Sequence, residues 1–316
     1  MLGWLAALLL ASTACTATRP GVSPSAQRLL LLEARDLGYL PPMESFGDDR
    51  CGINVPGTNL DEEEVHLGEY PWMALLGYTS TTTPDKITYN CGGTLINNRY
   101  VLTAAHCVSR LPKRLSVSSV RLGEHNVSTE LDCQMVGGRE VCTEPVQDFG
   151  IEKIIPHEEH HRPVKYRNDI ALVRLDRPVR RTNYVRPICL PFDASVRRAH
   201  VGQELTVAGF GAIRGQGDTV RELTVPVVGN KECSQVYRSY RTLIGAEQIC
   251  AGGERDRGAC AGDAGGPLMA MPAPGQPHYL IGVVSFGPAR CGTRNVPDVY
   301  TRVTEYEQWI VSNMRD

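Results

Sequence analysis

Residues 260–267 read Cys-Ala-Gly-Asp-Ala-Gly-Gly-Pro, a turn-forming stretch with three glycines. Two other short segments precede it in the chain, Thr103-Ala-Ala-His-Cys107 and Asn168-Asp-Ile-Ala-Leu172. Taken alone, His106 or Asp169 would most often be a structural residue. A histidine, an aspartate and a glycine-rich turn in this chain order are instead the components of a hydrolase triad with its oxyanion hole, with the nucleophile itself missing.

Short apolar runs separated by glycine, proline and asparagine surround these segments. The runs have the length of strands and are rich in Val, Ile, Leu and Thr, which favours β-strands. The clearest runs are residues 72–76, 100–103, 170–175, 205–208 and 279–286. No helical period runs through the middle of the chain, so the sequence predicts an all-β fold for this part.

The C-terminus has a different pattern. Apolar residues recur there at helical spacing: Val303, Tyr306, Ile310 and Met314. Thr304 and Glu307 would form a capping box at the start of this helix. The sequence therefore predicts an all-β domain closed by one C-terminal helix.

Further motifs occur in the same order as in a known family. They are Tyr70-Pro-Trp-Met, Cys91-Gly-Gly-Thr-Leu, Pro187-Ile-Cys-Leu-Pro191 and Pro297-Asp-Val-Tyr-Thr-Arg-Val303. With the three segments above, they make residues 65–316 resemble a chymotrypsin-like (trypsin-fold) serine protease domain. The resemblance implies two six-stranded antiparallel β-barrels with the site in the cleft between them.

One segment narrows the resemblance to a subgroup of this family. Residues 133–142, bounded by Cys133 and Cys142 and followed by Pro145-Val-Gln-Asp148, are similar to the same segment of arthropod clip-domain proteases of haemolymph cascades. A clip module has six cysteines, whereas only Cys15 and Cys51 precede Val65. A complete clip domain is therefore missing.

The resemblance assigns His106 as the general base and Asp169 as the residue that holds its tautomer. The nucleophile should be a serine at position 264, where this sequence has Ala264. An alanine has no oxygen to attack a carbonyl, although Gly262 and the N–H of Ala264 could still form an oxyanion hole. The sequence therefore predicts a serine protease homologue that is catalytically inactive. The alternatives are an active trypsin-like endopeptidase that carries an inactivating change at position 264 here, and an inert relic.

The activation sequence also departs from the family. Active relatives are cut after a basic residue, and the new Ile or Val amino terminus pairs with the aspartate beside the nucleophile, here Asp263. The corresponding position is Asn59, and no Lys or Arg lies between Arg50 and Lys86. We therefore expect Asp263 to lack its ion-pair partner, as in a zymogen.

The specificity pocket has an unusual residue pattern. In trypsin-like relatives an aspartate six residues before the nucleophile binds Arg or Lys, and here that residue is Gly258. Asp298 stands on the opposite wall, where such relatives have glycine. We expect Asp298 to point into the pocket, with Ser285 and Gly287 completing its walls; the alternative is that Asp298 turns outward to solvent.

The N-terminus predicts secretion. Residues 2–10 are apolar and are followed by small residues, as in a signal peptide. The stretch is too short for a spanning helix of about twenty residues, and a buried N-terminal helix is the alternative. We expect residues 1–17 to be a signal peptide, 18–64 a pro-segment or linker and 65–316 the protease-like domain.

Ten of the eleven cysteines lie beyond the signal peptide, and an even number in an oxidising compartment predicts disulfides. Spacing alone leaves the connectivity open. The resemblance implies the pairs Cys51–Cys189, Cys91–Cys107, Cys133–Cys142, Cys233–Cys250 and Cys260–Cys291.

Two other sites are candidates for metals. Glu124 and Asp132 lie where several relatives bind calcium, with an ordinary acidic loop as the alternative. His157-Glu-Glu-His-His161 matches a zinc-protease pattern, but its flanking prolines favour a solvated polar loop. Asn126 begins the chain's only glycosylation sequon.

The charge balance excludes one class of partner. Lys+Arg 33 against Asp+Glu 35 gives a formal charge of −2, with no basic field for nucleic acid. We expect a secreted protein that binds other cascade proteases, zymogens or inhibitors. It would act as a cofactor protein or regulator in an immune cascade of the melanisation type. We expect it to require no bound cofactor and to have no membrane partner.

Overall fold

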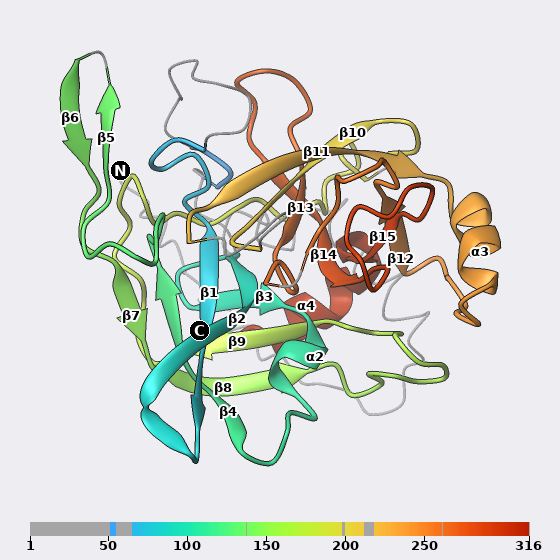
Figure 1. Cartoon of the computed structure of the whole chain (residues 1–316), viewed down its shortest axis with the longest axis horizontal. Coiled ribbons are helices and arrows are strands. Elements are labelled where there is room, and N and C mark those ends of the chain that lie inside the picture. Colours follow the sequence, from blue (N-terminus) through green and yellow to red (C-terminus); the bar gives the residue numbers. More distant parts are fainter. Residues whose placement is uncertain are drawn as a thin grey trace, which may run out of the picture. The chain divides into compact units, whose positions relative to one another are not determined.

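Two β-sheets, one from each half of the protease-like region, dominate the fold (Figure 1). The computed structural model describes residues 51–54, 65–136, 138–197, 200–211, 218–260 and 262–315. The predicted signal peptide, most of the predicted pro-segment and the sequence around Asn59 lie outside the described residues.

The strands follow one another with few helices between them. In chain order they are β1 (Met73–Ser80), β2 (Thr83–Leu95), β3 (Tyr100–Thr103), β4 (Leu115–Leu122), β5 (Cys133–Val136), β6 (Arg139–Cys142), β7 (Gln147–Phe149), β8 (Ile151–Pro156), β9 (Ala171–Leu175), β10 (Glu204–Gly209), β11 (Arg221–Val228), β12 (Gln248–Ala251), β13 (Pro267–Ala270), β14 (Tyr279–Phe286) and β15 (Asp298–Arg302). All five apolar runs singled out in the sequence fall in strands, with ends shifted by at most a few residues.

The first sheet is antiparallel and has the order β7-β4-β1-β2-β3-β9-β8. It contains seven strands where six were expected, because residues 147–156 are interrupted at Gly150 and give both β7 and β8. These two strands lie at opposite edges of the sheet, so this one run of chain nearly closes it into a barrel.

The second sheet is a closed six-stranded barrel in the order β10-β11-β12-β15-β14-β13. Its interior is filled by aliphatic side chains and Tyr300, with Val225, Leu268 and Ile249 fully buried. Closure leaves no unpaired edge. The two barrels of the expected trypsin-like fold are thus present.

The helices are short. They are α2 (Ala105–Val108), α3 (Asn230–Arg238), the 3-10 helix η2 (Val303–Tyr306) and α4 (Glu307–Asn313). The predicted C-terminal helix is present, but the predicted capping box is wrong, because Thr304 lies within the 3-10 turn and no side chain caps either segment. No described helix has the length and apolar character needed to cross a bilayer.

The sequence analysis missed α3. Only Cys233 and Tyr237 of this helix are buried, one turn apart. Two apolar contacts are too few to give a helical period, and the helix is held instead by the Cys233–Cys250 disulfide and by Tyr237, whose hydroxyl donates to the Pro297 carbonyl.

Buried hydrogen bonds join the two barrels around one residue. Thr301 Oγ1, on β15, donates to the Asp169 carbonyl at 2.7 Å, and Ser285 Oγ, on β14, donates to the Asp169 carboxylate at 2.5 Å. Trp72 Nε1, from the first barrel, lies 3.0 Å from Met269 Sδ of the second. The fold therefore fixes Asp169 between the barrels.

We predict that Thr301→Val lowers the free energy of unfolding by about 1–3 kcal/mol, because the variant leaves a buried carbonyl without its donor at nearly unchanged volume. Urea unfolding with the disulfides intact measures this. Thr242→Val, at a partly exposed position in the loop after α3, is the matched control and should stay within about 0.5 kcal/mol of the unsubstituted protein. Equal stability of Thr301→Val and the control would contradict the proposed coupling.

Candidate functional site

His106 and Asp169 lie together at the junction of the barrels. His106 is in the first turn of α2, and its Nδ1 lies 2.7 Å from Asp169 Oδ2. Its backbone N–H donates to Asp169 Oδ1 at 2.9 Å, so both carboxylate oxygens hold the same histidine. The imidazole is fixed with Nδ1 toward the carboxylate and Nε2 away from it, as a general base requires.

Asp169 is 2% exposed, and its charge governs the site. Burial alone would raise the pKa of Asp169, but the hydrogen bonds of His106 and Ser285 outweigh burial and hold that pKa below its usual value. For His106, burial disfavours the charged form, yet the hydrogen bond and charge of Asp169 overcome it and raise the pKa of His106. The pair therefore favours an ionised aspartate and a more basic histidine.

Ser285 has a role that the sequence analysis did not assign. Its place in the wall of the specificity pocket stays a prediction, and in addition its hydroxyl donates to Asp169 Oδ2 from a buried position. A lone serine near the end of a strand carries no sequence signal for this contact. Ser285 adds a donor to the carboxylate on the side opposite the first barrel.

His160 is the second residue that sequence reasoning missed. The prediction of a solvated loop is wrong for His160, which is 5% exposed, with Nδ1 3.3 Å from Ser109 Oγ and Nε2 3.5 Å from Asp169 Oδ1. Burial lowers the pKa of His160 to about 4, against the attraction of Asp169, so this imidazole is neutral near pH 7. Asp169 thus lies between one basic and one neutral histidine.

The turn that carries Ala264 packs directly against the His106 segment. Gly92 N–H donates to the Ala264 carbonyl at 2.8 Å. Gly265 adopts φ +79°, and a side chain there would meet the Gly92 carbonyl and Thr103. Within the described part of the chain, nothing accepts a hydrogen bond from the N–H groups of Gly262 or Ala264. The two N–H groups stay predicted oxyanion donors, and Ala264 has a methyl group at the position where relatives have the nucleophile.

Asp263 is buried and bonded to the backbone. Gly211 N–H donates to its Oδ1 at 2.7 Å and Cys260 N–H to its Oδ2 at 2.8 Å. Among the described residues no cation pairs with it, and burial raises the pKa of this carboxyl. A small hollow adjoins Asp263, lined also by Gly209, Leu223 and other residues. In active relatives the partner is a new amino terminus at the position that corresponds to Asn59, and the residues around Asn59 are outside the described chain.

Asp298 points into the predicted specificity pocket. Its Oδ2 accepts a hydrogen bond from Ala259 N–H at 2.8 Å, and a side chain at Gly258 would lie 2.7 Å from the same oxygen. A side chain at Gly287 would collide with Oδ1. The carboxylate thus lies between the two glycine-lined walls, and the alternative of an outward-facing Asp298 does not hold in this structure.

Two buried polar groups lie at the floor of this pocket, a carboxylate without a cationic partner and a hydroxyl without a hydrogen-bond partner among the described residues. Asp298 is 3% exposed, and burial, reinforced by the charge of Asp263, raises its pKa to about 7. Tyr300 follows on the same face of β15, and its buried hydroxyl has no hydrogen-bond partner among the described residues. A buried carboxylate and a free hydroxyl favour a bound cation or water at this point.

The structure joins the same five cysteine pairs that the resemblance implied. Cys51–Cys189 ties the residues before the domain to it, and Gly52 adds backbone bonds to Pro187 and His278. Cys260–Cys291 joins the loops at the mouth of the pocket. Asp256 N–H donates to the Gly292 carbonyl between those loops.

The loop proposed for calcium is closed by its own hydrogen bonds. Glu124 accepts from Arg121 and from His125 N–H. Asp132 accepts from the N–H groups of His125 and Asn126 and from Thr129 Oγ1. Calcium takes six to eight oxygen ligands, but here every carboxylate oxygen is used and a guanidinium lies beside Glu124. As arranged, these residues do not fit a calcium ion.

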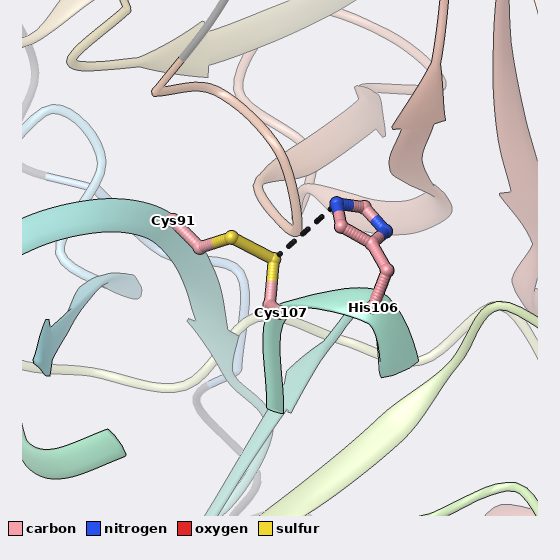
Figure 2. Close-up of side chains that lie close together, drawn as sticks. All are labelled: Cys91, His106 and Cys107. Atoms are coloured by element: carbon pink, nitrogen blue, oxygen red, sulfur yellow. Dashed lines mark hydrogen bonds between the residues drawn. A yellow bond between two sulfur atoms is a disulfide. The ribbon is translucent and has the colours of Figure 1, made fainter. Parts of the chain in front are cut away.

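Two other metal patterns also fail on geometry. Figure 2 shows Cys91, His106 and Cys107 close together, but the two sulfurs form a disulfide and offer no thiolate. In the zinc-like segment, His157 stacks on Trp309 and the His161 Nδ1 accepts from Tyr166 N–H. The rings of His160 and His161 lie close together, with centroids 3.9 Å apart, but His157 is engaged separately by Trp309.

Asn126 lies in the same surface loop as Asp132. Its side-chain oxygen accepts from both the N–H and the hydroxyl of Ser128, which forms a closed turn within the sequon. The structure places the sequon at the surface, and glycosylation remains a prediction.

The comparisons with known proteins agree with this geometry. The trypsin family model matches residues 60–310. The chain is 43% identical to phenoloxidase-activating factor 3 of Holotrichia diomphalia, over 84% of this chain and 75% of the relative. It is 40% identical to melanization protease 1 of Drosophila melanogaster, over 84% of this chain and 68% of the relative.

A solved structure extends the match. The crystal structure of the Drosophila Grass clip serine protease of the Toll pathway superposes with a TM-score of 0.74 at 36% identity, covering 86% of this chain and 77% of that one. A family match over most of the chain, supported by relatives at this identity, shows that the chain belongs to the trypsin family of serine proteases and that clip-domain serine proteases are among its relatives.

Proposed function

We propose that this protein is a secreted, catalytically inactive serine protease homologue that binds a basic side chain of a partner without cutting the partner's chain. The observation that carries the proposal is the combination of Ala264 at the nucleophile position with Asp298 turned into the pocket. One change removes covalent chemistry, and the other keeps a site for Arg or Lys.

Loss of the nucleophile has a large chemical effect. In a comparable triad, removing the serine lowers kcat by about 10⁶. His106 and Asp169 keep their geometry here, but the histidine has no serine hydroxyl to deprotonate. The oxyanion donors alone would leave about 10³–10⁴-fold over the uncatalysed reaction, which is negligible for peptide hydrolysis.

Binding does not require the nucleophile. Asp298 is buried without a cationic partner among the described residues, so a guanidinium or ammonium that enters the pocket relieves an unfavourable charge. Two relatives carry names that refer to phenoloxidase activation and melanisation, and a third is a protease of the Toll pathway. We propose a cofactor or regulator that binds a protease, zymogen or inhibitor of such an extracellular cascade, with no cofactor of its own.

An active trypsin-like endopeptidase is the second candidate, with Ala264 as an inactivating change in this sequence. The intact His106–Asp169 pair and the two unengaged oxyanion N–H groups support it. The sequence around Asn59 counts against it, because a tryptic activator finds no basic residue there. The codon for residue 264 in the native transcript distinguishes the two candidates.

We predict that the purified protein does not react with a serine-directed organophosphonate and gives no burst with an active-site titrant, because position 264 offers no hydroxyl. Mass spectrometry measures the labelled fraction, with an active trypsin as the positive control. Stoichiometric labelling at any residue would overturn the inactive assignment.

Restoring the serine alone should restore little activity. We predict that Ala264→Ser stays at least about 100-fold below the variant that also carries Thr58→Arg, Asn59→Ile, Leu60→Val, Asp61→Gly and Glu62→Gly and has been cleaved after the new arginine. The new amino terminus would neutralise Asp263, whose buried charge is otherwise held only by N–H groups. Hydrolysis of an arginine anilide compares the two. Equal rates would show that the activation sequence is irrelevant.

Binding of benzamidine, an arginine-like cation, should depend on Asp298 and on pH. Asp298 has a raised pKa, so it is mostly neutral below pH 7 and charged above it. We predict that the affinity rises about tenfold from pH 6 to pH 8, as the fraction of charged Asp298 increases. Titration calorimetry at both pH values measures it.

Asp298→Asn is expected to weaken binding at pH 8 at least tenfold and to remove most of the pH dependence. Asp256→Asn is the matched control, since this partly exposed aspartate lies on the neighbouring loop. Equal effects of the two substitutions would contradict the pocket assignment.

A further inference from the structure

Two segments of the second half of the chain are basic and contain no acidic residue. They are residues 233–246, which include most of α3 and the turn after it, and residues 288–297, which follow β14. The chain as a whole has a formal charge of −2, so these segments depart from its overall balance. Their exposed arginines are Arg238, Arg241, Arg290 and Arg294.

The fold holds these two segments together. The Tyr237 hydroxyl, on α3, donates to the Pro297 carbonyl at 2.7 Å. Ile244 and Val296, one from each segment, both pack on the buried cluster that contains Cys233. The helix α3 lies at the edge of the second barrel, beside β12 and β15 (Figure 1). The four arginines therefore lie on neighbouring parts of the surface.

Most of these arginines have no carboxylate partner. Arg99 and Arg121, on the first barrel, each pair with a glutamate or an aspartate. Arg290, in contrast, approaches only Asp256, at 3.9 Å. Within the described ranges of the chain, no carboxylate pairs with the other three, which are Arg238, Arg241 and Arg294.

Two exposed apolar side chains lie among these charges. Tyr240 is 51% exposed and Leu243 is 65% exposed, both in the turn directly after α3. Between them, Arg241 adopts φ +54°, a left-handed conformation that favours glycine and is unfavourable for arginine. The turn thus keeps a charged side chain, between two apolar ones, at a position where glycine fits more easily. Tyrosine and arginine are also the residues that contribute most often to binding energy at protein interfaces.

We propose that residues 238–243, with Arg290 and Arg294, form a docking site for an acidic segment of a partner protein, and we call this site the α3 surface. Carboxylates of the segment would pair with the arginines, and an apolar side chain of the segment would cover Leu243. A sulfated polysaccharide supplies anionic groups but no apolar side chain, so the exposed leucine favours a protein. The proposal rests on the proposed function for the class of partner, whereas the α3 surface itself does not include Asp298.

Two peptides probe the α3 surface. They are the acetylated amides Asp-Glu-Leu-Glu-Asp-Phe-Glu and Asp-Glu-Ser-Glu-Asp-Ser-Glu, which have the same acidic residues and differ only in their apolar side chains. Neither contains Arg or Lys, so neither offers a cation to Asp298. Titration calorimetry at low and at moderate salt measures their affinities, with benzamidine as a separate probe of the pocket.

Three double variants are compared with the unsubstituted protein. Arg238→Glu with Arg241→Glu reverses two charges of the α3 surface. Arg114→Glu with Arg139→Glu is the matched control, because these two arginines are also exposed but lie in the first half of the chain. Tyr240→Ser with Leu243→Ser removes the apolar contacts and leaves the charges. All six positions are exposed, so the variants should fold.

The unsubstituted protein should bind the peptide with Leu and Phe at least about fivefold more tightly than the serine peptide, because only the former can bury apolar surface. Its affinity should fall at least about fivefold from about 50 mM to about 300 mM salt, as expected for exposed ion pairs. Arg238→Glu with Arg241→Glu should weaken both peptides at least about tenfold, and the control by less than about twofold. Tyr240→Ser with Leu243→Ser should bind the two peptides equally.

Equal losses in the two charge-reversed proteins would reveal only a general attraction between charges and would overturn the site. Heparin that binds more tightly than either peptide, with no effect of the serine substitutions, would assign the surface to a polysaccharide and overturn the proposal. Self-association that Arg238→Glu with Arg241→Glu abolishes would assign the surface to a second copy and also overturn it. Failure of benzamidine to bind, with the peptide results as expected, would refute the cation pocket and still support the α3 surface.

Discussion

The buried carboxylate of Asp169 is the constraint on which the arrangement of this molecule depends. A carboxylate at 2% exposure is costly unless its oxygens are bonded. Here the donors come from both barrels: His106 from the first, through its ring and its backbone, and Ser285 from the second. The carbonyl of the same residue accepts from Thr301. The two sheets therefore meet around one charge, and the cleft between them carries the site.

Under the proposed function, catalysis and binding are separated in this chain. His106 and Asp169 keep the geometry of a triad pair, while Ala264 has a methyl group at the position where relatives have the nucleophile. Asp298, in contrast, supplies the pocket with a charge from the wall opposite the position used in trypsin-like relatives. In the proposed function, these two features give the protein a site for a basic residue and no means of cutting next to it.

The sequence predicted much of this because short motifs carry it. The segments around His106, Asp169 and residues 260–267 gave the family and the two barrels, and the resemblance gave cysteine pairs that the structure also joins. The structure differs where the cause is a long-range contact. His160 is buried against Asp169, and Tyr166 stacks on Phe286, which lies 120 positions away in the chain. No local pattern encodes such contacts.

The most direct test of the inactive assignment and of the cation pocket is a crystal structure of the unmodified protein grown with an excess of an arginine-containing peptide. We predict an intact peptide with its guanidinium on Asp298 and continuous density through the bond after the arginine. A cleaved peptide would contradict the loss of catalysis, and a guanidinium bound elsewhere, with Asp298 unoccupied, would contradict the proposed mode of binding.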